Sequence, residues 1–355
     1  MDFDAHSLRA KKAVLDSRLQ ERLSDMRKEW SKREAERERL LEQSQHLIEE
    51  VKDIRLKTID NIDKRVLSAL DYFESIGTKT YMAGTPKELA EYMRDHLGKS
   101  EIAILPSPEL TEAKLVQAFG MSNKIYSVSL ENRLCEDQGL PLLHPLFPTS
   151  LISDEETLSK IKEKISTELE RAEIMIIAVH GISLDGSVYL DSSAHEFLKK
   201  TGSKKKMFFV VIVDRIYQKE SEMRDVLKLR EIASGFMSKS VKLEQLPKDT
   251  HLILFDNGRI ALSRSGMREM LACINCSSCS LFCPVFGSVG YNYGPPFMAG
   301  IGNFMASRSD GIKNSVSRGL YMCLLCGACK EHCPLGLDIP KAIAETRRRA
   351  NISKL

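Results

Sequence analysis

The chain has 355 residues, 43% of them hydrophobic, so it is long enough for two or three globular domains. Its formal net charge of +3 gives no reason to expect a polyanionic partner such as nucleic acid. The longest strand-like apolar run, MFFVVIV at residues 207–213, is far shorter than the roughly 18 residues of a membrane span. The N-terminal MDFDAHSLRAKK lacks the apolar core of a signal peptide. These features predict a cytoplasmic protein without a transmembrane segment.

Residues 1–57 predict a charged helical arm. Apolar residues recur there at intervals of three, four and seven, as on one face of a helix, and the polar run SKREAERERL interrupts them. These residues are Leu8, Leu15, Leu19, Leu23, Met26, Trp30, Leu40, Leu47 and Val51. A helix this polar buries little of its own surface. It either lies along its own domain or forms a coiled-coil-like arm that docks on another subunit.

Residues 58–265 alternate helical and strand-like patterns, which predicts an α/β domain around a mainly parallel sheet. The strand-like runs are TKTYMAG, EIAILPS, EIMIIAV and MFFVVIV. In HLILFDNGRIALS, two apolar runs flank Asn257 and Gly258, so this stretch predicts a β-hairpin with a two-residue turn. Residues 266–355 form a third, cysteine-bearing segment that ends in a helix starting near Pro340.

Eight of the nine cysteines lie in two copies of one pattern, CINCSSCSLFCP at residues 273–284 and CLLCGACKEHCP at residues 323–334. Thiolates at CxxCxxCxxxCP spacing are the ligands of [4Fe–4S] clusters, so two copies predict two clusters. Structural zinc is the alternative, but it explains only the CxxC pairs. Such crowding also indicates a reducing compartment. The ninth cysteine, Cys135, has no second cysteine near it and is predicted to be an ordinary thiol.

The fourth cysteine of such a motif normally reaches the neighbouring cluster, so we expect crossed ligation. The first cluster is predicted to take Cys273, Cys276, Cys279 and Cys333. The second is predicted to take Cys323, Cys326, Cys329 and Cys283.

Residues 274–307, between the two motifs, contain no charged side chain. Two compatible interpretations stay open. The stretch forms a dry shell that tunes the reduction potential of the clusters, or it is a docking surface for a redox partner. The sequence has neither a P-loop nor a G-x-G-x-x-G pattern after a strand. A flavin or nicotinamide is therefore expected on another chain.

The stretches HLILFDNGRIALSRSGMREMLACINCSSCSLFCPVFG, YGPPFMAGIGNF and CLLCGACKEHCP resemble the LutB-type iron–sulfur proteins of lactate utilisation. The resemblance covers residues 45 to about 345. It implies an α/β LUD domain with a NagB/RpiA/CoA-transferase-like fold, joined by a D-N-G-R turn to an α-helical, two-cluster ferredoxin-like domain. The cysteine motifs alone also occur in heterodisulfide-reductase and succinate-dehydrogenase-type subunits.

The segment AVHGISLDGSVYLDSSA (178–194) is similar to the loop that such folds place over a ligand pocket. The candidate pocket residues are His180, Asp185, Gly186, Ser187 and Asp214. Alternatively, the glycines only turn the chain and Asp185 caps it. Asp256, Asn257, Gly258 and Arg259 are either further pocket residues or a plain hairpin turn.

The sequence departs from the family in two respects. It is shorter than usual LutB-type proteins, and AILPSPELTEAK (103–114) replaces a basic, serine-containing stretch. Only Ser107 and Glu112 are carried over from that stretch as candidate ligand contacts.

Together, the motifs and the resemblance predict an iron–sulfur electron-transfer subunit of a cytoplasmic oxidoreductase complex that oxidises lactate or a related 2-hydroxy acid. The carbon chemistry is expected on a partner: a CCG-domain subunit, a second LUD protein or a flavin dehydrogenase. Two alternatives are a heterodisulfide-reductase-like electron carrier for another substrate, and a LUD module that senses a ligand and reports through the clusters. No catalytic residue is assigned.

Overall fold

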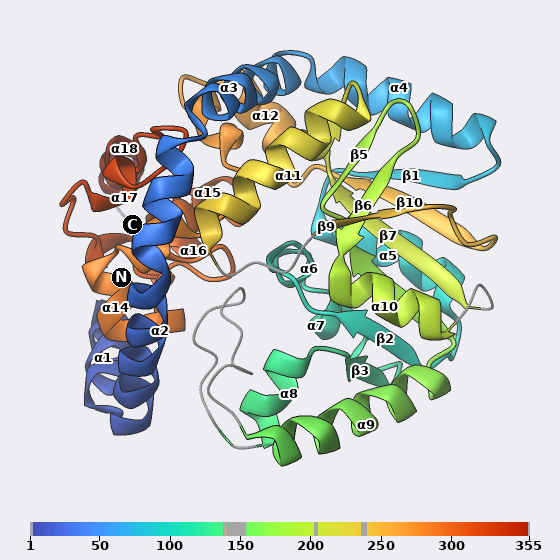
Figure 1. The fold of residues 1–355 in the computed structure, drawn as a ribbon, viewed down its shortest axis with the longest axis horizontal. Coiled ribbons are helices and arrows are strands. Elements are labelled where there is room, and N and C mark those ends of the chain that lie inside the picture. The colour runs from blue at the N-terminus through green and yellow to red at the C-terminus, as the bar shows by residue number, and fades with distance from the viewer. Residues whose placement is uncertain (1–2, 138, 140–153, 202–204, 236–239, 354–355) are drawn as a thin grey trace.

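The computed structural model describes residues 3–137, 139, 154–201, 205–235 and 240–353. Figure 1 shows an α/β body on one side and, on the other, helices from both ends of the chain lying side by side. The predicted fold class, α/β with an N-terminal helical region and a helical cysteine-bearing segment, is confirmed.

A six-stranded parallel sheet forms the centre of the body. In spatial order its strands are β1 (Lys79–Ala83), β10 (Thr250–Phe255), β7 (Lys206–Ile212), β4 (Ile174–Ala178), β2 (Ile102–Leu105) and β3 (Ile125–Ser127). A second sheet has the order β8 (Ile216–Tyr217), β5 (Gly181–Ser183), β6 (Val188–Asp191) and β9 (Ser240–Leu243). Because the strands of the large sheet run the same way, their carboxyl ends meet at one edge, where α/β folds bind ligands.

Helices and the second sheet cover the two faces of the parallel sheet. The helices of the body are α4 (Ile62–Ser75), α5 (Pro86–Leu97), α6 (Pro108–Glu112), α7 (Leu115–Phe119), α8 (Leu130–Asp137), α9 (Glu155–Arg171), α10 (Ser192–Thr201), α11 (Glu220–Ser234) and α12 (Arg259–Ser263), with a 3-10 turn, η3 (Val213–Arg215). In β7, Phe208 and Val210 join the core under α5, whereas Phe209 and Val211 join the core under α4 and α9. This alternation follows from the period of two in a strand.

The hairpin predicted at Asn257 and Gly258 is wrong. Strand β10 ends at Phe255, and the chain then enters helix α12. The Asp256 carboxylate starts that helix, because it accepts hydrogen bonds from the backbone N–H of Gly258 (3.2 Å) and of Ile260 (2.7 Å). Both sides of β10 already pair in parallel, with β1 and β7, so no edge is left for an antiparallel partner.

The N-terminal region forms α1 (Phe3–Leu15), α2 (Ser17–Glu42) and α3 (Gln45–Asp60). Helix α2 begins where the Asp16 side chain accepts a hydrogen bond from the Leu19 backbone. Its apolar face, including Leu23 and Met26, packs against Phe286 and Tyr293 of the cysteine-bearing segment. In this structure the helices therefore lie along their own chain, as one of the two interpretations of the arm expects.

In its described part, residues 266–353, the cysteine-bearing segment consists of short helices and 3-10 turns joined by loops. Its elements are η4 (Arg268–Ala272), α13 (Ser278–Leu281), α14 (Pro284–Val289), η5 (Gly290–Asn292), α15 (Ala299–Ser309), α16 (Ile312–Ser317), η6 (Leu320–Met322), α17 (Ala328–Glu331) and α18 (Ile339–Ile352). One hydrophobic core joins these helices to α3 and α11. Apolar packing thus continues across the predicted domain boundaries at residues 57 and 265. The domain limits 1–57, 58–265 and 266–355 stay a prediction. None of the described helices combines the length and apolar character needed to cross a membrane.

Replacing Leu23 by alanine should destabilise the chain, because this fully buried side chain is where α2 meets the cysteine-bearing segment. Removing a buried leucine typically costs about 2–5 kcal/mol. Urea denaturation followed by circular dichroism measures the loss. Leu15→Ala is the matched control, since Leu15 is 72% exposed. Equal stability of the two variants would contradict the packing of α2 described above.

Candidate iron–sulfur centre and ligand pocket

The two cysteine motifs share one backbone conformation. In each, a 3-10 turn leads into the first cysteine, and left-handed residues follow at the same two offsets. These are Asn275 and Ser277 in the first motif, and Leu325 and Gly327 in the second. The first of each pair points its N–H at the preceding cysteine sulfur: Asn275 N to Cys273 Sγ is 3.3 Å, and Leu325 N to Cys323 Sγ is 3.4 Å.

Each motif contributes to two separate cavities. The first cysteine cavity is lined by Cys273, Cys276, Cys279 and Cys333. The second cysteine cavity is lined by Cys283, Cys323, Cys326 and Cys329. Three cysteines of one motif thus face the fourth cysteine of the other, which is the grouping that crossed ligation predicts. The ligation itself stays a prediction.

The chemistry of these donors fits a metal cluster. All eight thiols are free of disulfides. Burial raises the pKa of the Cys273 and Cys329 thiols to about 12 and that of Cys333 to about 11. Four neighbouring thiolates in such surroundings need a compensating positive charge, which iron supplies. The backbone N–H groups directed at sulfur favour the thiolate as well.

The sulfurs surround each cavity and do not meet at one point. Within the described ranges, no three or more Cys, His, Asp or Glu side chains converge as the ligands of one metal ion must. A tetrahedral zinc site requires such convergence. A cluster instead binds each cysteine to a different iron atom, so it does not require the four sulfurs to approach one point.

The uncharged stretch 274–307 is mainly internal. Only Pro284 and Ser288 within it are exposed, and Tyr293 is 1% exposed. Phe297 and Ile301 form part of the wall of the first cysteine cavity. The stretch therefore serves as an apolar shell around the cysteines and leaves little exposed surface on which a partner could dock.

The two cavities differ in exposure. Cys276 and Cys279 of the first are 8% and 9% exposed. In the second, Cys326 is exposed and is preceded by Leu324 and Leu325, which are 67% and 42% exposed. The second cysteine cavity thus lies nearer the surface.

Buried arginines from the N-terminal helices hold the first motif, and no sequence pattern predicts this role for them. Arg37 of α2 donates hydrogen bonds to the carbonyls of Ala233 (2.8 Å) and His332 (3.0 Å) and to the hydroxyl of Ser278 (3.1 Å). Arg55 of α3 donates to the carbonyl oxygens of Leu271 and Ala272, just before Cys273. The sequence predicts only a charged helical arm over residues 1–57, because a charge pattern does not reveal a distant partner.

The predicted pocket residues separate into two groups. Strands β5 and β8 pair in parallel, with Ile182 beside Ile216, so His180 and Asp214 share one end of this pair. Asp185, Gly186 and Ser187 lie at the other end, in the β5–β6 turn.

These three turn residues have structural contacts. Asp185 accepts a hydrogen bond from the Glu220 backbone at the start of α11 (2.9 Å), and Ser187 donates to the Glu220 carboxylate (3.0 Å). Gly186 has a φ of +89°, and a Cβ there would lie 2.3 Å from the Tyr72 hydroxyl. Their placement supports the alternative in which these residues turn and cap the chain.

His180 and Asp214 lie at the carboxyl edge of the parallel sheet. The His180 Nδ1 pairs with the Ser240 hydroxyl at 2.9 Å, and burial together with Arg230 and Arg215 lowers its pKa well below the usual range. A neutral imidazole is therefore expected near neutral pH.

Asp214 belongs to a buried ion-pair network at this edge. The ion pairs join Arg55 to Asp214 (2.7 Å), Arg259 to Glu112 (2.7 Å) and to Asp214 (3.4 Å), and Arg215 to Glu109 (2.7 Å). The sequence singled out Asp214, Arg259 and Glu112, but missed the others. Ser107 instead caps α6, because its side-chain hydroxyl accepts a hydrogen bond from the Leu110 backbone N–H at 3.2 Å. Of the D-N-G-R residues, only Arg259 joins the network.

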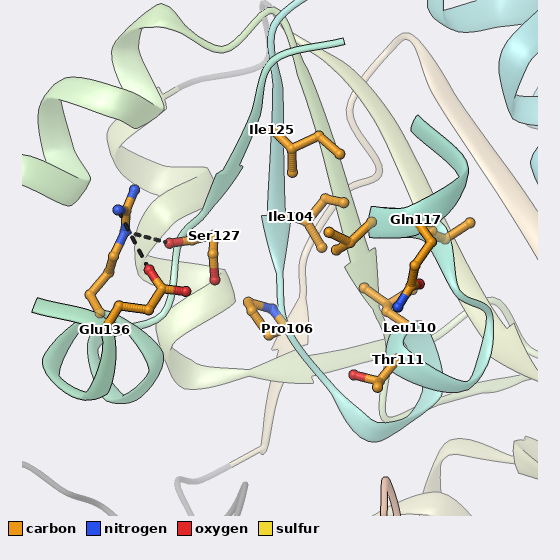
Figure 2. Close-up of a pocket in the computed structure, with 11 residues that line it drawn as sticks. Ile104, Pro106, Leu110, Thr111, Gln117, Ile125, Ser127 and Glu136 are labelled. Carbon is orange, nitrogen blue, oxygen red and sulfur yellow. Dashed lines mark hydrogen bonds and ion pairs between the residues drawn. The ribbon is translucent and has the colours of Figure 1, made fainter. Parts of the chain in front are cut away.

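A larger cavity of about 280 Å³ opens beyond β2 and β3. Figure 2 shows Ser127 and Glu136 on one side, Gln117 and Thr111 on the other, and Pro106 between them. Ile104, Ile125 and Leu110 give it an apolar floor. None of the five predicted pocket residues lines it.

Comparison with known proteins agrees with the cysteine geometry. Residues 269–337 match the family model of the 4Fe-4S dicluster domain. Over 103 residues the chain is 34% identical to an uncharacterized electron transport protein, YkgF, of Escherichia coli, and to lactate utilization protein B of Exiguobacterium sp. and of Bacillus cereus. Each match covers 29% of this chain and 22% of the relative, so the chain matches about a fifth of these relatives' length.

Two solved structures show weaker similarity. A DUF162 family protein from Deinococcus radiodurans has a TM-score of 0.32 and 16% identity, covering 57% of this chain and 98% of its own. The eIF2B beta structure from Chaetomium thermophilum has a TM-score of 0.27 and 11% identity, covering 44% of each chain. Scores of this size do not establish a shared fold.

The chain is thus an iron–sulfur protein that carries a 4Fe–4S dicluster domain. Its predicted resemblance to the LutB-type proteins of lactate utilisation is confirmed over a match of 103 residues.

Serine at Cys283 should perturb the cluster held by the second triplet, because Cys283 lines the second cysteine cavity. Electron paramagnetic resonance of the reduced protein should show the signal change that Cys326→Ser also gives. Cys333→Ser should share its change with Cys276→Ser. The control is Cys135→Ser, since Cys135 lies in α8 outside both cavities. A Cys283 variant that alters the Cys276-dependent signal instead would show local ligation.

Proposed function

We propose that this chain is the iron–sulfur electron-transfer subunit of a cytoplasmic oxidoreductase complex that oxidises lactate or a related 2-hydroxy acid. The observation that carries the proposal is the pair of cavities, each lined by four cysteines drawn from both motifs. The dicluster match and the similarity to lactate utilization protein B support it. The crowding of thiols, which suits a reducing compartment, supports the cytoplasmic location.

In this proposal, each set of four cysteines holds one [4Fe–4S] cluster, and a bound cluster supplies reversible uptake of one electron. The apolar stretch 274–307 keeps water from the sulfurs. Arg37 and Arg55 fix the backbone beside Cys273 and Cys333 through hydrogen bonds to main-chain carbonyls. Because Cys326 is exposed, the second centre is proposed to exchange electrons with a partner.

Partner subunits supply the chemistry at carbon. Oxidation of a 2-hydroxy acid to an oxo acid releases two electrons and two protons, whereas each cluster carries one electron. A flavin or nicotinamide accepts such a pair, and the sequence shows no binding motif for either. The proposed partners are a CCG-domain subunit, a second LUD protein or a flavin dehydrogenase. Purification of the complex from its native host, with identification of its subunits and lactate-dependent reduction of the clusters, tests the assignment.

One further observation supports the alternative function, in which the α/β domain senses a ligand and reports through the clusters. A cavity at the carboxyl edge of the parallel sheet is lined by Asp214, Arg215 and Arg259 and also by Cys273. A ligand there would lie beside the first cysteine cavity. An iron–sulfur subunit that purifies without redox partners, and whose clusters respond to a bound metabolite, would favour sensing over electron transfer.

The pure chain, reconstituted with iron and sulfide but free of flavin, is expected not to oxidise lactate. It has one-electron centres and no recognisable site for a two-electron acceptor. Lactate-dependent dye reduction should stay at the background rate, while dithionite reduces the clusters as a control for their integrity. Sustained turnover with lactate alone would overturn this expectation.

Glutamate at both Leu324 and Leu325 should slow electron exchange with the native partner about tenfold, since a charge disfavours the core of an interface. Iron content is measured in parallel, because both side chains are exposed but also line the second cysteine cavity. The matched control is Val116→Glu, which adds a charge at a 56% exposed apolar residue on α7. Unchanged exchange rates in the double variant would show that the partner docks elsewhere.

A further inference from the structure

The two cysteine motifs differ at one position that faces a sulfur. Counted from the first cysteine, Ser278 of the first motif corresponds to Ala328 of the second. Ser278 is fully buried, and its hydroxyl oxygen lies 3.4 Å from the Cys276 sulfur. A sulfur bound to iron is a thiolate, which accepts a hydrogen bond but has no hydrogen to donate. With iron bound, the Ser278 hydroxyl is therefore the donor, and the methyl group of Ala328 offers no counterpart in the second motif.

Arg37 holds this hydroxyl in place beside the sulfur. It donates from Nη2 to the Ser278 oxygen (3.1 Å) and from Nε to the Ala233 carbonyl (2.8 Å). The Ala233 carbonyl is a second acceptor for the Ser278 hydroxyl, at 2.7 Å, but it is neutral and already accepts from Arg37. Because a charged acceptor forms the stronger hydrogen bond, the hydroxyl hydrogen is expected to turn to the thiolate of Cys276.

Two buried guanidinium groups add positive charge beside the same sulfur. Arg37 is 3% exposed and Arg230 is 6% exposed, and both interact electrostatically with Cys276. Within the described residues, Arg37 donates to neutral oxygen atoms, and the Nε of Arg230 has no hydrogen-bond partner. Burial lowers the pKa of Arg230 to about 10, so this side chain stays charged near neutral pH. An anionic cluster bound through Cys276 is thus a counter-charge for both arginines.

The remaining charges near the first cysteine cavity largely cancel. Three further arginines at the carboxyl edge of the sheet are each matched by a buried carboxylate. These ion pairs are Arg55–Asp214, Arg215–Glu109 and Arg259–Glu112. Glu34, Glu38 and Asp191 also act on the two guanidinium groups, but each is at least partly exposed, so solvent screens its charge. The excess positive charge beside the first cluster is therefore that of Arg37 and Arg230.

The second cysteine cavity has a weaker set of such groups. The Tyr293 hydroxyl forms a hydrogen bond with Cys323, and Arg347 donates to the carbonyl oxygens of Leu320 and Cys323. Arg347 is partly exposed, so solvent screens its charge more than that of a buried guanidinium. The charges that act most strongly on Cys329 are those of other cysteines. One hydroxyl and one partly screened arginine thus stand against one hydroxyl and two buried arginines in the first cavity.

We propose that Ser278, Arg37 and Arg230 are positioning residues that give the first cluster the higher reduction potential, so that it accepts electrons from the second. Positive charge and hydrogen bonds to sulfur stabilise the reduced cluster, which is one unit more negative. Water near the exposed Cys326 also favours reduction, but two full charges in a buried environment act more strongly.

The transfer involves one electron only. The reduced second cluster loses it and is oxidised, the first cluster gains it and is reduced, and no proton or covalent bond changes. The inference rests on the proposed electron-transfer function. It makes the second cysteine cavity the entry for electrons from a partner, and the first cavity, whose Cys273 borders the α/β body, their destination.

Redox titration of the reconstituted chain, followed by electron paramagnetic resonance, tests the order of the potentials. The signals altered in Cys276→Ser and Cys326→Ser assign the two clusters, and the first should be reduced at the higher potential. Ser278→Ala should shift the reduction equilibrium of the first cluster about threefold towards the oxidised state, because one hydrogen bond to sulfur is lost. Ser280→Ala is the matched control, since this buried hydroxyl lies on the same helix and has no hydrogen-bond partner among the described residues.

Removal of a charge should have the larger effect. Arg230→Gln should shift the same equilibrium about tenfold towards the oxidised state, or about 59 mV for a one-electron centre. Arg230→Lys keeps the charge and should retain most of the wild-type potential. Arg224→Gln removes a charge from an exposed position of the same helix and should change neither cluster. An equal shift in Arg230→Lys and Arg230→Gln would show a structural effect and overturn the role of the charge.

The outcomes separate this inference from the proposed function. Equal potentials, or a lower potential for the first cluster, overturn the inference alone. The same holds if Ser278→Ala keeps both its iron and the wild-type potential, and this variant decides the matter where Arg230→Gln fails to fold. Failure of lactate to reduce the native complex overturns the proposed function alone, because the titrations need no partner. A chain that binds no iron overturns both.

Discussion

Eight thiols must be held together in two groups of four, and the rest of the structure is arranged around that constraint. Each group draws three cysteines from one motif and one from the other, so neither motif lines a complete cavity alone. Burial strongly opposes ionisation of several of these thiols. The fold surrounds the thiols with backbone N–H groups directed at sulfur, with an apolar shell, and with arginines that hold the neighbouring backbone in place. The metal-binding segment is therefore structurally continuous with the helices and the sheet that support it.

The rings of Phe282 and His332 show how closely the two motifs are joined. Each residue precedes the fourth cysteine of its motif, and their rings stack with centroids 3.5 Å apart and planes 3° from parallel. Trp30 of α2 meets the Phe282 ring edge-on, at 5.7 Å. Equivalent positions of the repeat thus contact each other directly, and the N-terminal region covers that contact. This packing keeps the relative positions of the two cysteine cavities fixed.

The local patterns of the sequence predicted the fold class and the grouping of cysteines, because both depend on short-range spacing. Alternating apolar residues indicated β7 and β4, and the repeated CxxCxxCxxxCP spacing indicated which residues share a cavity. The hairpin at Asn257 was wrong because the turn signal says nothing about the two parallel neighbours that occupy β10. Arg37 and Arg55 were missed for the same reason. Their partners lie more than 150 residues away, and a single sequence does not show which charges become buried.

The hydrogen bonds of Arg37 have a consequence for how the protein is made. Its partners Ser278 and the His332 carbonyl lie 241 and 295 residues further along the chain. At roughly 5–20 residues per second, a ribosome takes about 10–60 s to add them after Arg37 has been synthesised. During that interval Leu23, Met26 and Trp30 have no cysteine-bearing segment to pack against. The first helices therefore leave the ribosome with an apolar face that stays uncovered until the cysteine-bearing segment has been synthesised.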